Sequence, residues 1–469
     1  MRKKVWKTLP ILLLSLIALL FYAVHTRQTK ASGTIYIRAD GSIEGTDKIQ
    51  RDGDLYTLTG NITDAGGIVI QRSNITLDGA GYTLKGENAT GSRGVYVFKE
   101  TNITIRNIRI ETFATGIWLE NCADSRIEES QILDSFLNGF NLKNVSCIQV
   151  SGCYIANNMD NGVYIEYSSN NTICGNLIEL NSLHYLVTYL GGIKLYYSSN
   201  DTIFQNTITN NYEDGIECWY SSDSKIYNNT ITNCAGNGIM ITHSSISIHE
   251  NEITSCKNAI DFWYASGSKV YNNKLVDNKY GFSADSNSGN NYIYNNQISS
   301  NNETGITIYS SLNSIHDNMI SNNKIGIELL GYYAKNNTIY TNNITNNDVG
   351  VSLSSYAANN TFYQNNFLDN TQQVSGESLK LNFWNGNYSV GGNYWSDFTT
   401  RYPTAEDTKS GPYQNETGSD NIWDSPYIID ANNVDNYPIV PELSLTFTIT
   451  FMITSLLSAT IYKKKRTPK

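Results

Sequence analysis

The chain has 469 residues, of which 40% are hydrophobic and 16% are charged, and its formal net charge is −10 at pH 7. This acidic balance excludes nucleic-acid binding that relies on a basic stripe to neutralise phosphates. The seven cysteines contain no Cys-x-x-Cys pair of the kind that indicates a zinc site.

The N-terminal residues 1–31 are predicted to be a signal peptide or an uncleaved signal anchor. A basic start, Met1-Arg2-Lys3-Lys4, precedes an apolar run from about Leu9 to Val24 and small residues near Ala31. Residues 34–93 then contain short, β-branched, alternating runs broken by Gly, Asp and Asn, which are typical of strands and turns. We expect this segment to form the N-terminal cap and the first coils of a solenoid, whose open end needs an atypical unit to shield it.

Residues 94–370 repeat one pattern: Gly-Ile-x-Leu, a polar turn, Ile-Tyr-x-Asn-x-Ile and another turn. The repeats are about 21 to 24 residues long, except for one 30-residue step from Gly162 to Gly192. Such a period indicates a solenoid. A leucine-rich repeat is disfavoured because the repeats are rich in Ile and Asn and leave no stretch of helical length. The sequence therefore predicts an all-β fold, a right-handed parallel β-helix of about a dozen coils.

Two further residue types recur at fixed places in the repeat. An Asn follows the second strand in nine successive repeats, and we expect these amides to stack inside the turn as a structural ladder. Two positions earlier, aromatic residues form an outward ladder that includes Tyr271, Tyr294 and His316. The extra residues of the long step, around 181–191 with His184, Tyr185 and Tyr189, predict either a loop on a binding face or a tolerated surface loop.

Outward positions of the Gly-Ile strand form two rows, because side chains of a strand alternate between its faces. The first outward row is Trp118, Asn141, Tyr164, Lys194, Glu217, Met240 and Asp261. The second outward row is Glu120, Lys143, Glu166, Tyr196, Trp219, Thr242, Trp263, Asp285 and Tyr309. Tyr167, Tyr197, Tyr220, His243 and Tyr264 run beside them.

Aromatic rings interleaved with carboxylates suit sugars, whose C–H faces pack on rings and whose hydroxyls bond to acids. The predicted saccharide-binding residues are Tyr164, Glu166, Tyr196, Trp219, His243 and Trp263. The alternative is that this face packs against a loop or another protein, or reflects β-propensity alone.

If the face is catalytic, Glu217 and Asp261 are the predicted pair. They lie in one row two coils apart, which places their backbones about 10 Å apart, near the upper end of the range for inverting glycoside hydrolysis. Lys194 precedes Glu217 in the same row, and we expect these two residues to form a salt bridge. No His or Cys set at a convincing spacing predicts a copper site, since His249 and His316 lie about 14 Å apart on the strand spacing.

After Asn370 the period is lost, and residues 371–440 become aromatic and acidic. Two runs stand out, Asn393-Tyr-Trp-Ser-Asp397 and Asp424-Ser-Pro-Tyr-Ile-Ile-Asp430. Together with the opening Ile35–Gly41, this tail resembles that of NosD-type parallel β-helix proteins, a group widespread among archaeal surface proteins. The resemblance covers about Thr34 to Pro438. It implies a right-handed β-helix related to carbohydrate-binding and sugar-hydrolase domains, and named members serve copper-centre maturation. This sequence differs from the NosD-type pattern at Asn385, since members of that group often have an Asp after the Trp.

Acidic residues of this tail give one further prediction. Asp424, Asp430 and Asp435 are candidate calcium ligands, because Ca²⁺ prefers oxygen donors. The competing interpretation is a capping loop of surface acids. No other cofactor is predicted.

The C-terminal residues 443–462 are mostly apolar and are predicted to be a transmembrane anchor, followed by a basic cytoplasmic tail at 463–469. A buried terminal helix is the alternative. Fourteen Asn-x-Ser/Thr sequons fit a glycosylated surface protein.

These observations predict a cell-surface protein, anchored in the cytoplasmic membrane with its body outside, that binds polysaccharide or a surface glycan and no nucleic acid. The alternatives are a polysaccharide hydrolase or lyase on the same face, a structural envelope protein, or NosD-like copper-centre maturation. The oligomeric state is not predicted.

Overall fold

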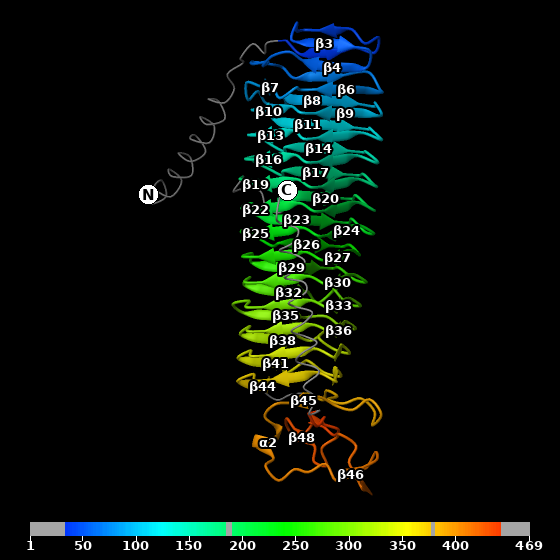
Figure 1. The fold of residues 1–469 in the computed structure, drawn as a ribbon, viewed down its shortest axis with the longest axis vertical. Coiled ribbons are helices and arrows are strands. Elements are labelled where there is room, and N and C mark those ends of the chain that lie inside the picture. Colours follow the sequence, from blue (N-terminus) through cyan, green and yellow to red (C-terminus); the bar gives the residue numbers. More distant parts are fainter. Residues whose placement is uncertain (1–32, 184–189, 377–379, 442–469) are drawn as a thin grey trace, which may run out of the picture. The chain divides into compact units, whose positions relative to one another are not determined.

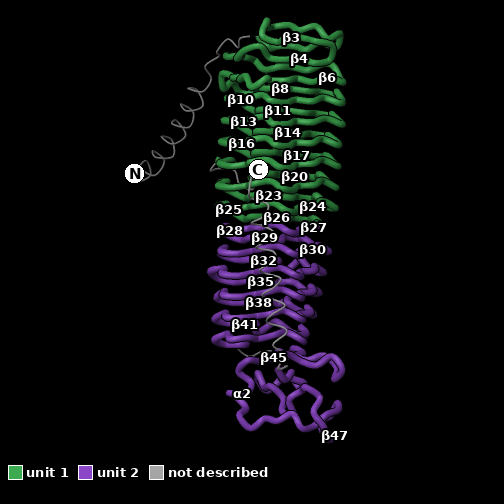
Figure 2. The backbone as a smooth tube through the Cα atoms, in the orientation of Figure 1, with its two compact units in different colours: residues 1–246 green, residues 247–469 purple. Residues whose placement is uncertain are grey.

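The structure is a computed structural model that describes residues 33–183, 190–376 and 380–441. It divides into two compact units, Met1–Ile246 and Ser247–Lys469 (Figure 2), a division that the sequence does not predict. Each unit is built from coils of three short strands, and equivalent strands of successive coils pair in parallel (Figure 1). The predicted right-handed parallel β-helix is confirmed.

In the first unit the Gly-Ile strands form the first sheet, and the other two strands of each coil form the second and third sheets. The first sheet consists of β1 (Ile35–Ile37), β2 (Ile43–Glu44), β5 (Ile68–Ile70), β8 (Arg93–Phe98), β11 (Thr115–Glu120), β14 (Phe140–Lys143), β17 (Val163–Glu166), β20 (Gly191–Tyr196), β23 (Asp214–Trp219) and β26 (Ile239–Thr242). The second consists of β3 (Ile49–Asp52), β4 (Leu55–Leu58), β6 (Ile75–Asp78), β9 (Ile103–Arg106), β12 (Arg126–Glu128), β15 (Gln149–Ser151), β18 (Thr172–Cys174), β21 (Thr202–Phe204) and β24 (Lys225–Tyr227). The third consists of β7 (Thr83–Lys85), β10 (Arg109–Glu111), β13 (Gln131–Leu133), β16 (Tyr154–Ala156), β19 (Leu177–Glu179), β22 (Thr207–Thr209) and β25 (Thr230–Thr232).

The second unit repeats this arrangement. Its first sheet consists of β29 (Asn258–Trp263), β32 (Tyr280–Ala284), β35 (Thr304–Ile308), β38 (Ile325–Leu329), β41 (Val349–Leu353) and β44 (Gln372–Ser375). Its second sheet consists of β27 (Ser247–His249), β30 (Lys269–Tyr271), β33 (Tyr292–Tyr294), β36 (Ser314–His316), β39 (Thr338–Tyr340) and β42 (Thr361–Tyr363). Its third sheet consists of β28 (Glu252–Thr254), β31 (Lys274–Val276), β34 (Gln297–Ser299), β37 (Met319–Ser321), β40 (Asn343–Thr345), β43 (Asn366–Leu368) and β45 (Tyr394–Trp395).

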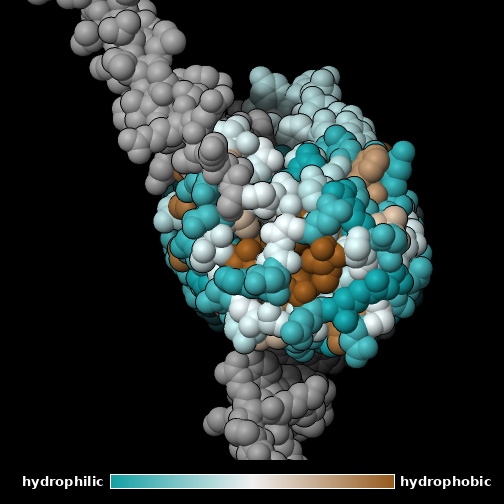
Figure 3. Space-filling view, turned by 90° about the horizontal axis from the view of Figure 1, so that it is seen from above, coloured by the Kyte–Doolittle hydropathy of each residue, from teal (hydrophilic) through white to brown (hydrophobic). Residues whose placement is uncertain are grey.

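The end of the first unit is closed by hairpins within the segment predicted as the N-terminal cap. β1 pairs with β2, and β3 with β4, in antiparallel fashion, and Tyr56 is fully buried with its hydroxyl donating to the Gly41 carbonyl at 3.0 Å. Seen from above, this end shows mostly hydrophilic residues around a small hydrophobic area (Figure 3). In these two sheets the antiparallel hairpins cover the edge at which the parallel pairing begins. This cover limits pairing of the edge with a strand of another molecule.

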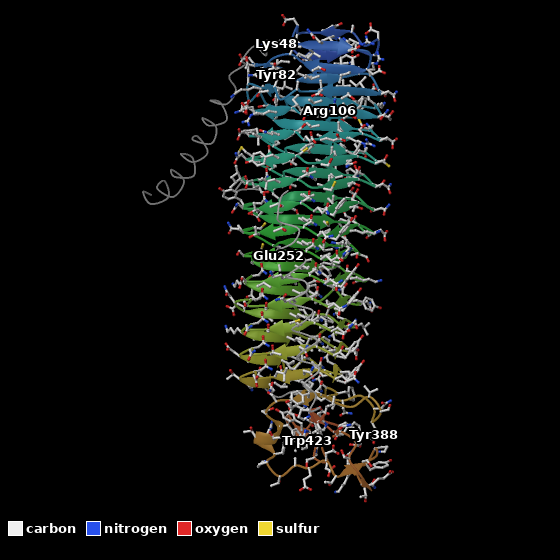
Figure 4. The ribbon with its side chains drawn as sticks, in the orientation of Figure 1. Lys48, Tyr82, Arg106, Glu252, Tyr388 and Trp423 are labelled. Atoms are coloured by element: carbon white, nitrogen blue, oxygen red, sulfur yellow. The ribbon has the colours of Figure 1, made fainter. Side chains whose placement is uncertain are left out.

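Alternation along each strand decides which side chains fill the core. Inward Ile, Leu and Val residues such as Ile216, Ile231 and Ile306 are fully buried, and Cys218 is buried at an inward position. The residues between them project outward along the stack of each unit (Figure 4). The landmark glycine is required by the next coil, since a Cβ on Gly305 would lie 2.7 Å from the Gly326 carbonyl oxygen.

The predicted asparagine ladder is confirmed. Asn318 Oδ1 accepts bonds of 3.0 Å from both the backbone N–H and the Nδ2 of Asn296, and its own Nδ2 donates to Ile293 O at 2.8 Å and to Asn342 Oδ1 at 2.9 Å. The residue before the ladder asparagine adopts the left-handed conformation, for example Asp317 with φ 55°.

Two more asparagine ladders exist that the sequence analysis missed. One joins the turns after the third sheet and includes Asn278, Asn301, Asn323 and Asn347. The other joins the corners before the second sheet and includes Asn313, Asn337, Asn360 and Asn382. In these coils all three turns are therefore tied to the next coil by buried amides, whereas at some turns of the first unit Ser125, Ser130 or Asp201 takes the place of the asparagine.

The described C-terminal residues, 380–441, plug the end of the second unit (Figure 4). They include α2 (Phe398–Arg401), β46 (Lys409–Ser410), β47 (Glu416–Thr417), β48 (Tyr427–Ile428) and β49 (Val434–Asp435). Trp384 stacks on Phe362 and Trp395 on Phe367, each with ring centroids 4.3 Å apart, and both tryptophans are buried. These rings cover the apolar core where the coils stop.

Among the described residues, no helix has the length and apolar character needed to cross a membrane. The predicted signal segment 1–31, the predicted anchor 443–462 and the basic tail lie outside the described residues, as do His184, Tyr185 and Tyr189 of the long step.

We expect the Asn318→Ala variant to lose about 3 kcal/mol or more of unfolding free energy, because four hydrogen-bonding groups of neighbouring residues lose a buried partner. Urea unfolding followed by circular dichroism measures the loss. Asn322→Gly is the matched control: Asn322 is exposed with φ 56°, which glycine adopts freely, so its stability should change by less than about 0.5 kcal/mol. Equal losses in the two variants would contradict a structural role for the ladder.

Candidate functional site

The two outward rows predicted from the sequence exist in the first unit. Backbone register pairs Tyr164 with Lys194, Lys194 with Glu217, and Glu217 with Met240. The second row runs beside it, with Glu166 opposite Tyr196 and Tyr196 opposite Trp219. The predicted binding residues of this unit therefore share one face of the first sheet.

Most of the charged groups on this face already have partners within it. Lys194 Nζ lies 2.9 Å from Glu217 Oε2, which confirms the predicted salt bridge, and Lys143 Nζ lies 3.3 Å from Glu166 Oε1. Burial raises the pKa of the Glu217 carboxyl, while Lys194 lowers it in part. Glu217 is 0% exposed, so its outward position does not make it a surface residue.

The rings beside these rows stack on each other along the unit. Tyr197 and Tyr220 have ring centroids 4.6 Å apart, and Tyr220 and His243 are also 4.6 Å apart, in nearly parallel planes. Tyr196 meets Tyr197 edge to face at 4.7 Å. Because each stacked ring covers the face of the next, these side chains present mainly edges and hydroxyl groups to solvent, and a sugar needs an open ring face.

Of the remaining predicted residues, Tyr164 donates its hydroxyl to Glu166 Oε2 at 3.4 Å, and burial together with that carboxylate raises the pKa of Tyr164. Lys194 lies 5.3 Å from the centroid of the Trp219 ring. The five predicted binding residues of the first unit thus form one network of contacts.

The second unit presents a different arrangement on its first sheet. A pocket of about 340 Å³ is lined by Asp261, Trp263, Ser283, Asp285, Ser286 and Tyr309. The strands β29, β32 and β35 position these residues, since Asp261 pairs with Ser283, Asp285 N donates to Phe262 O, and Tyr309 N donates to Ala284 O. Trp263, Asp285 and Tyr309 are consequently successive members of the second outward row.

The order aromatic, acid, aromatic opens this pocket. Trp263 and Tyr309 lie two coils apart, about 10 Å on the strand spacing, with Asp285 between them. Because the carboxylate of Asp285 is too small to cover a ring, neither aromatic ring is stacked within the row. Trp263 is 47% exposed and Tyr309 is 39% exposed. A space lined by two exposed rings suits a sugar ring.

Hydrogen bonds fix the two acids of the pocket. Asp261 Oδ2 accepts from Trp263 Nε1 at 3.1 Å and from Asn258 Nδ2 at 3.3 Å, which orients the indole. Burial raises the pKa of the Asp261 carboxyl, and the Trp263 N–H lowers it in part. Asp285 Oδ1 accepts from the Tyr264 and Asn287 backbones and from the Ser288 hydroxyl. Its Oδ2 accepts, among the described residues, only the 3.4 Å bond from Asn287 Nδ2.

The sequence placed Trp263 among the binding residues and Asp261 in the catalytic pair, and it placed Asp285 and Tyr309 in the second outward row. It missed Ser283 and Ser286, which complete the pocket. The interruption of an aromatic row by one acid is the sequence signal for this site. Glu217 and Asp261 belong to different units, each described by itself, so the separation of this predicted pair stays a prediction.

The three candidate calcium ligands are held separately by protein donors. Asp424 accepts from Thr408 and Lys409, and Asp430 accepts from Asn432 and Asn433. Asp435 is fully buried and accepts from Asn393 N at 2.7 Å, Trp395 Nε1 at 2.9 Å and Tyr437 N at 3.1 Å. These contacts serve the cap, and no calcium role is supported by them.

The described residues also contain no group of three or more His, Cys, Asp and Glu side chains that could hold a metal ion. His249 stacks on Tyr271, and His316 lies between Tyr294 and Tyr340 in the predicted aromatic ladder. These rings serve the ladder, and the described side chains do not fit a copper centre.

Comparison with known proteins gives a family. The family model described as periplasmic copper-binding protein (NosD) matches residues 32–233, 185–292 and 212–400. No curated protein matches the chain.

Three solved structures are similar to parts of the chain. The periplasmic alginate epimerase AlgG is 13% identical with a TM-score of 0.42, covering 63% of this chain and 80% of its own. DFA-IIIase from Arthrobacter chlorophenolicus A6 is 11% identical with a TM-score of 0.37, covering 52% and 65%. The Azotobacter vinelandii mannuronan C-5 epimerase AlgE4 A-module is 13% identical with a TM-score of 0.36, covering 66% and 89%.

The buried carboxyl of Asp435 predicts a pH dependence of the C-terminal cap. Burial raises its pKa from 3.8 to about 7, against the N–H donors that lower it. The folded protein therefore holds a proton that the unfolded chain releases between these values, so this group's stabilisation is complete below about pH 4 and is lost as pH rises to about 7, by about 4 kcal/mol in all. Urea unfolding monitored by tryptophan fluorescence across this range should show the decline, and Asp435→Asn should flatten it. A slope unchanged in the variant would assign the effect to other groups.

Proposed function

This chain belongs to the family of periplasmic copper-binding proteins named NosD, and we propose that it works outside the cytoplasm as a saccharide-binding protein. The binding site is the pocket of the second unit that is lined by Trp263, Asp285 and Tyr309. A membrane anchor at 443–462, with the body outside, belongs to the same proposal. Copper handling has no support in the described side chains of this chain.

One observation carries the proposal: two exposed rings stand on either side of a carboxylate, without stacking on each other. The rings supply apolar faces for the C–H faces of a sugar, and Asp261, Asp285, Ser283 and Ser286 supply acceptors and hydroxyl groups for its O–H groups. The Asp261 carboxylate fixes the Trp263 indole before a ligand arrives, which lowers the entropic cost of binding.

The outward face of the first unit, with the stacked rings of Tyr197, Tyr220 and His243, is a weaker candidate for saccharide binding. Its rings cover one another, and its carboxylates are paired with lysines. Tyr167 is the member whose ring is most open, at 52% exposed, and it is stacked on Tyr197. We therefore place the proposed binding site in the second unit.

Hydrolysis is the second candidate, and one feature favours it. The pocket holds two carboxylates, of which Asp261 has a raised pKa and so is suited to give a proton to a leaving oxygen, while Asp285 can accept one from water. Strand spacing and rise put their backbones about 8 Å apart. If the pocket is catalytic, Asp261→Asn should keep the binding of neutral saccharides and abolish the release of reducing ends. If the unsubstituted protein binds the saccharide and releases no reducing ends, hydrolysis is excluded and saccharide binding remains.

We expect the Trp263→Ala variant to lose at least about tenfold in affinity, because a stacked ring contributes about 1 kcal/mol beyond its buried area. A glycan array of neutral, amino and uronic oligosaccharides identifies the ligand, and titration calorimetry measures its affinity. Tyr292→Ala is the control, since Tyr292 is 48% exposed but lies on the second sheet. Equal affinity of the Trp263→Ala variant and the unsubstituted protein would exclude this pocket. Absence of binding to every glycan would favour a structural envelope role.

Glycosylation is a separate prediction from the sequons. Asn102, Asn170 and Asn228 are exposed sequon residues at left-handed corners, whereas ladder asparagines are buried. Peptide mapping of native protein should find glycans on the exposed sequons. Asn102 Nδ2 donates to Asn74 Oδ1 on the neighbouring coil at 3.0 Å, so one molecule should carry a glycan on only one of these two. Fully unmodified sequons would refute a glycoprotein.

A further inference from the structure

The charges around the pocket of the second unit indicate which sugars it accepts. Asp261 and Asp285 are its charged lining residues, and none of the six lining residues is basic. Glu328 extends the same face, since Ser283 pairs with Thr307 and Thr307 pairs with Glu328. Burial raises the pKa of the Tyr309 hydroxyl, and the charges of Glu328 and Asp261 add to this rise. The pocket therefore lies in a negative field.

Two lysines of the following coils are engaged elsewhere. Lys324 Nζ lies 2.8 Å from Glu303 Oε2, and Lys335 Nζ lies 3.6 Å from the centroid of the Tyr332 ring. The charge of Lys257 lowers the pKa of Asp261, but its side chain does not line the pocket. These cations therefore leave the pocket itself without a positive group.

We propose that this pocket selects an amino sugar, whose ammonium group lies between Asp261 and Asp285 while its ring packs between Trp263 and Tyr309, and that it rejects uronic acids. The inference rests on the proposed saccharide binding and adds the charge of the ligand. An ammonium group offers donors to Asp285 Oδ2 and to the Asp261 carboxylate, and a hydrogen bond to a charged group is stronger than one between neutral groups. A uronate would bring a third carboxylate into a pocket with two, where like charges repel.

The test uses the full chain and matched β-1,4-linked oligomers of glucosamine, glucose and glucuronic acid, with their galacto- and manno-configured counterparts on the same array. We expect the amino oligomers to bind about tenfold more tightly than the neutral ones, uronic oligomers to bind most weakly, and the amino preference to shrink with added salt. Uronic or neutral oligomers that bind as tightly as amino oligomers would overturn the selectivity and leave saccharide binding intact. Binding to no member would overturn the proposed function itself, and the selectivity with it.

Variants separate the charge of the pocket from its shape. Asp285→Asn keeps the oxygen that accepts from the Tyr264 and Asn287 backbones, so we expect it to fold, to bind the amino oligomer about tenfold less tightly and to bind the neutral oligomer as before. Asp261→Asn should have the same selective effect through the second carboxylate. Asp348→Asn, an exposed acid outside the pocket, is the control and should change neither affinity. Equal loss for amino and neutral oligomers in both pocket variants would contradict the proposal.

Discussion

The in-register stacking of coils, tied at many turns by buried asparagine amides, is the constraint on which the rest of the structure depends. Each amide uses both lone-pair and N–H capacity, as Asn318 does with Asn296, Ile293 and Asn342. A slip of one residue would turn every inward Ile outward and leave these amides buried without partners. The register is therefore fixed by the hydrogen bonds of the buried amides as well as by the burial of apolar side chains.

This register also decides what the surface can do. Equivalent residues of successive coils lie one strand spacing apart, so like rings stack and opposite charges pair, as Tyr197 with Tyr220 and Lys194 with Glu217. In a row of matching residues the rings and charges already have partners within the row, so few groups remain to bind a ligand. A pocket arises where the row changes residue type, as at Trp263, Asp285 and Tyr309.

The family signature in the tail has a structural task. Asn393 continues the ladder from Asn365, Asn433 continues the one from Asn382, and Asp435 binds the indole of Trp395. These residues close an apolar core whose last coil has no neighbour. The family match covers residues 32–400, which are the coils and the beginning of the cap, while the ligand depends on residues that the fold does not constrain.

The sequence by itself determined the architecture, because period, alternation and the recurring Asn each act through neighbours one coil away. It also determined the outward rows, the Lys194–Glu217 pair and the aromatic ladder, which follow from strand alternation once the period is known. It did not show the two other asparagine ladders as ladders, because their residues vary along the chain between Asn, Asp and Ser.

Only the tertiary structure decided which outward residues are available. Glu217 is outward by alternation and yet buried, and the rings beside it hide one another's faces. Whether the side chains of a row cover one another or leave a pocket depends on their size and orientation across three coils. The alternation of a strand determines only which face a side chain is on. The same reason explains why Trp263 and Asp261 were found from the sequence, whereas the pocket that joins them to Ser283, Asp285, Ser286 and Tyr309 required the packed coils.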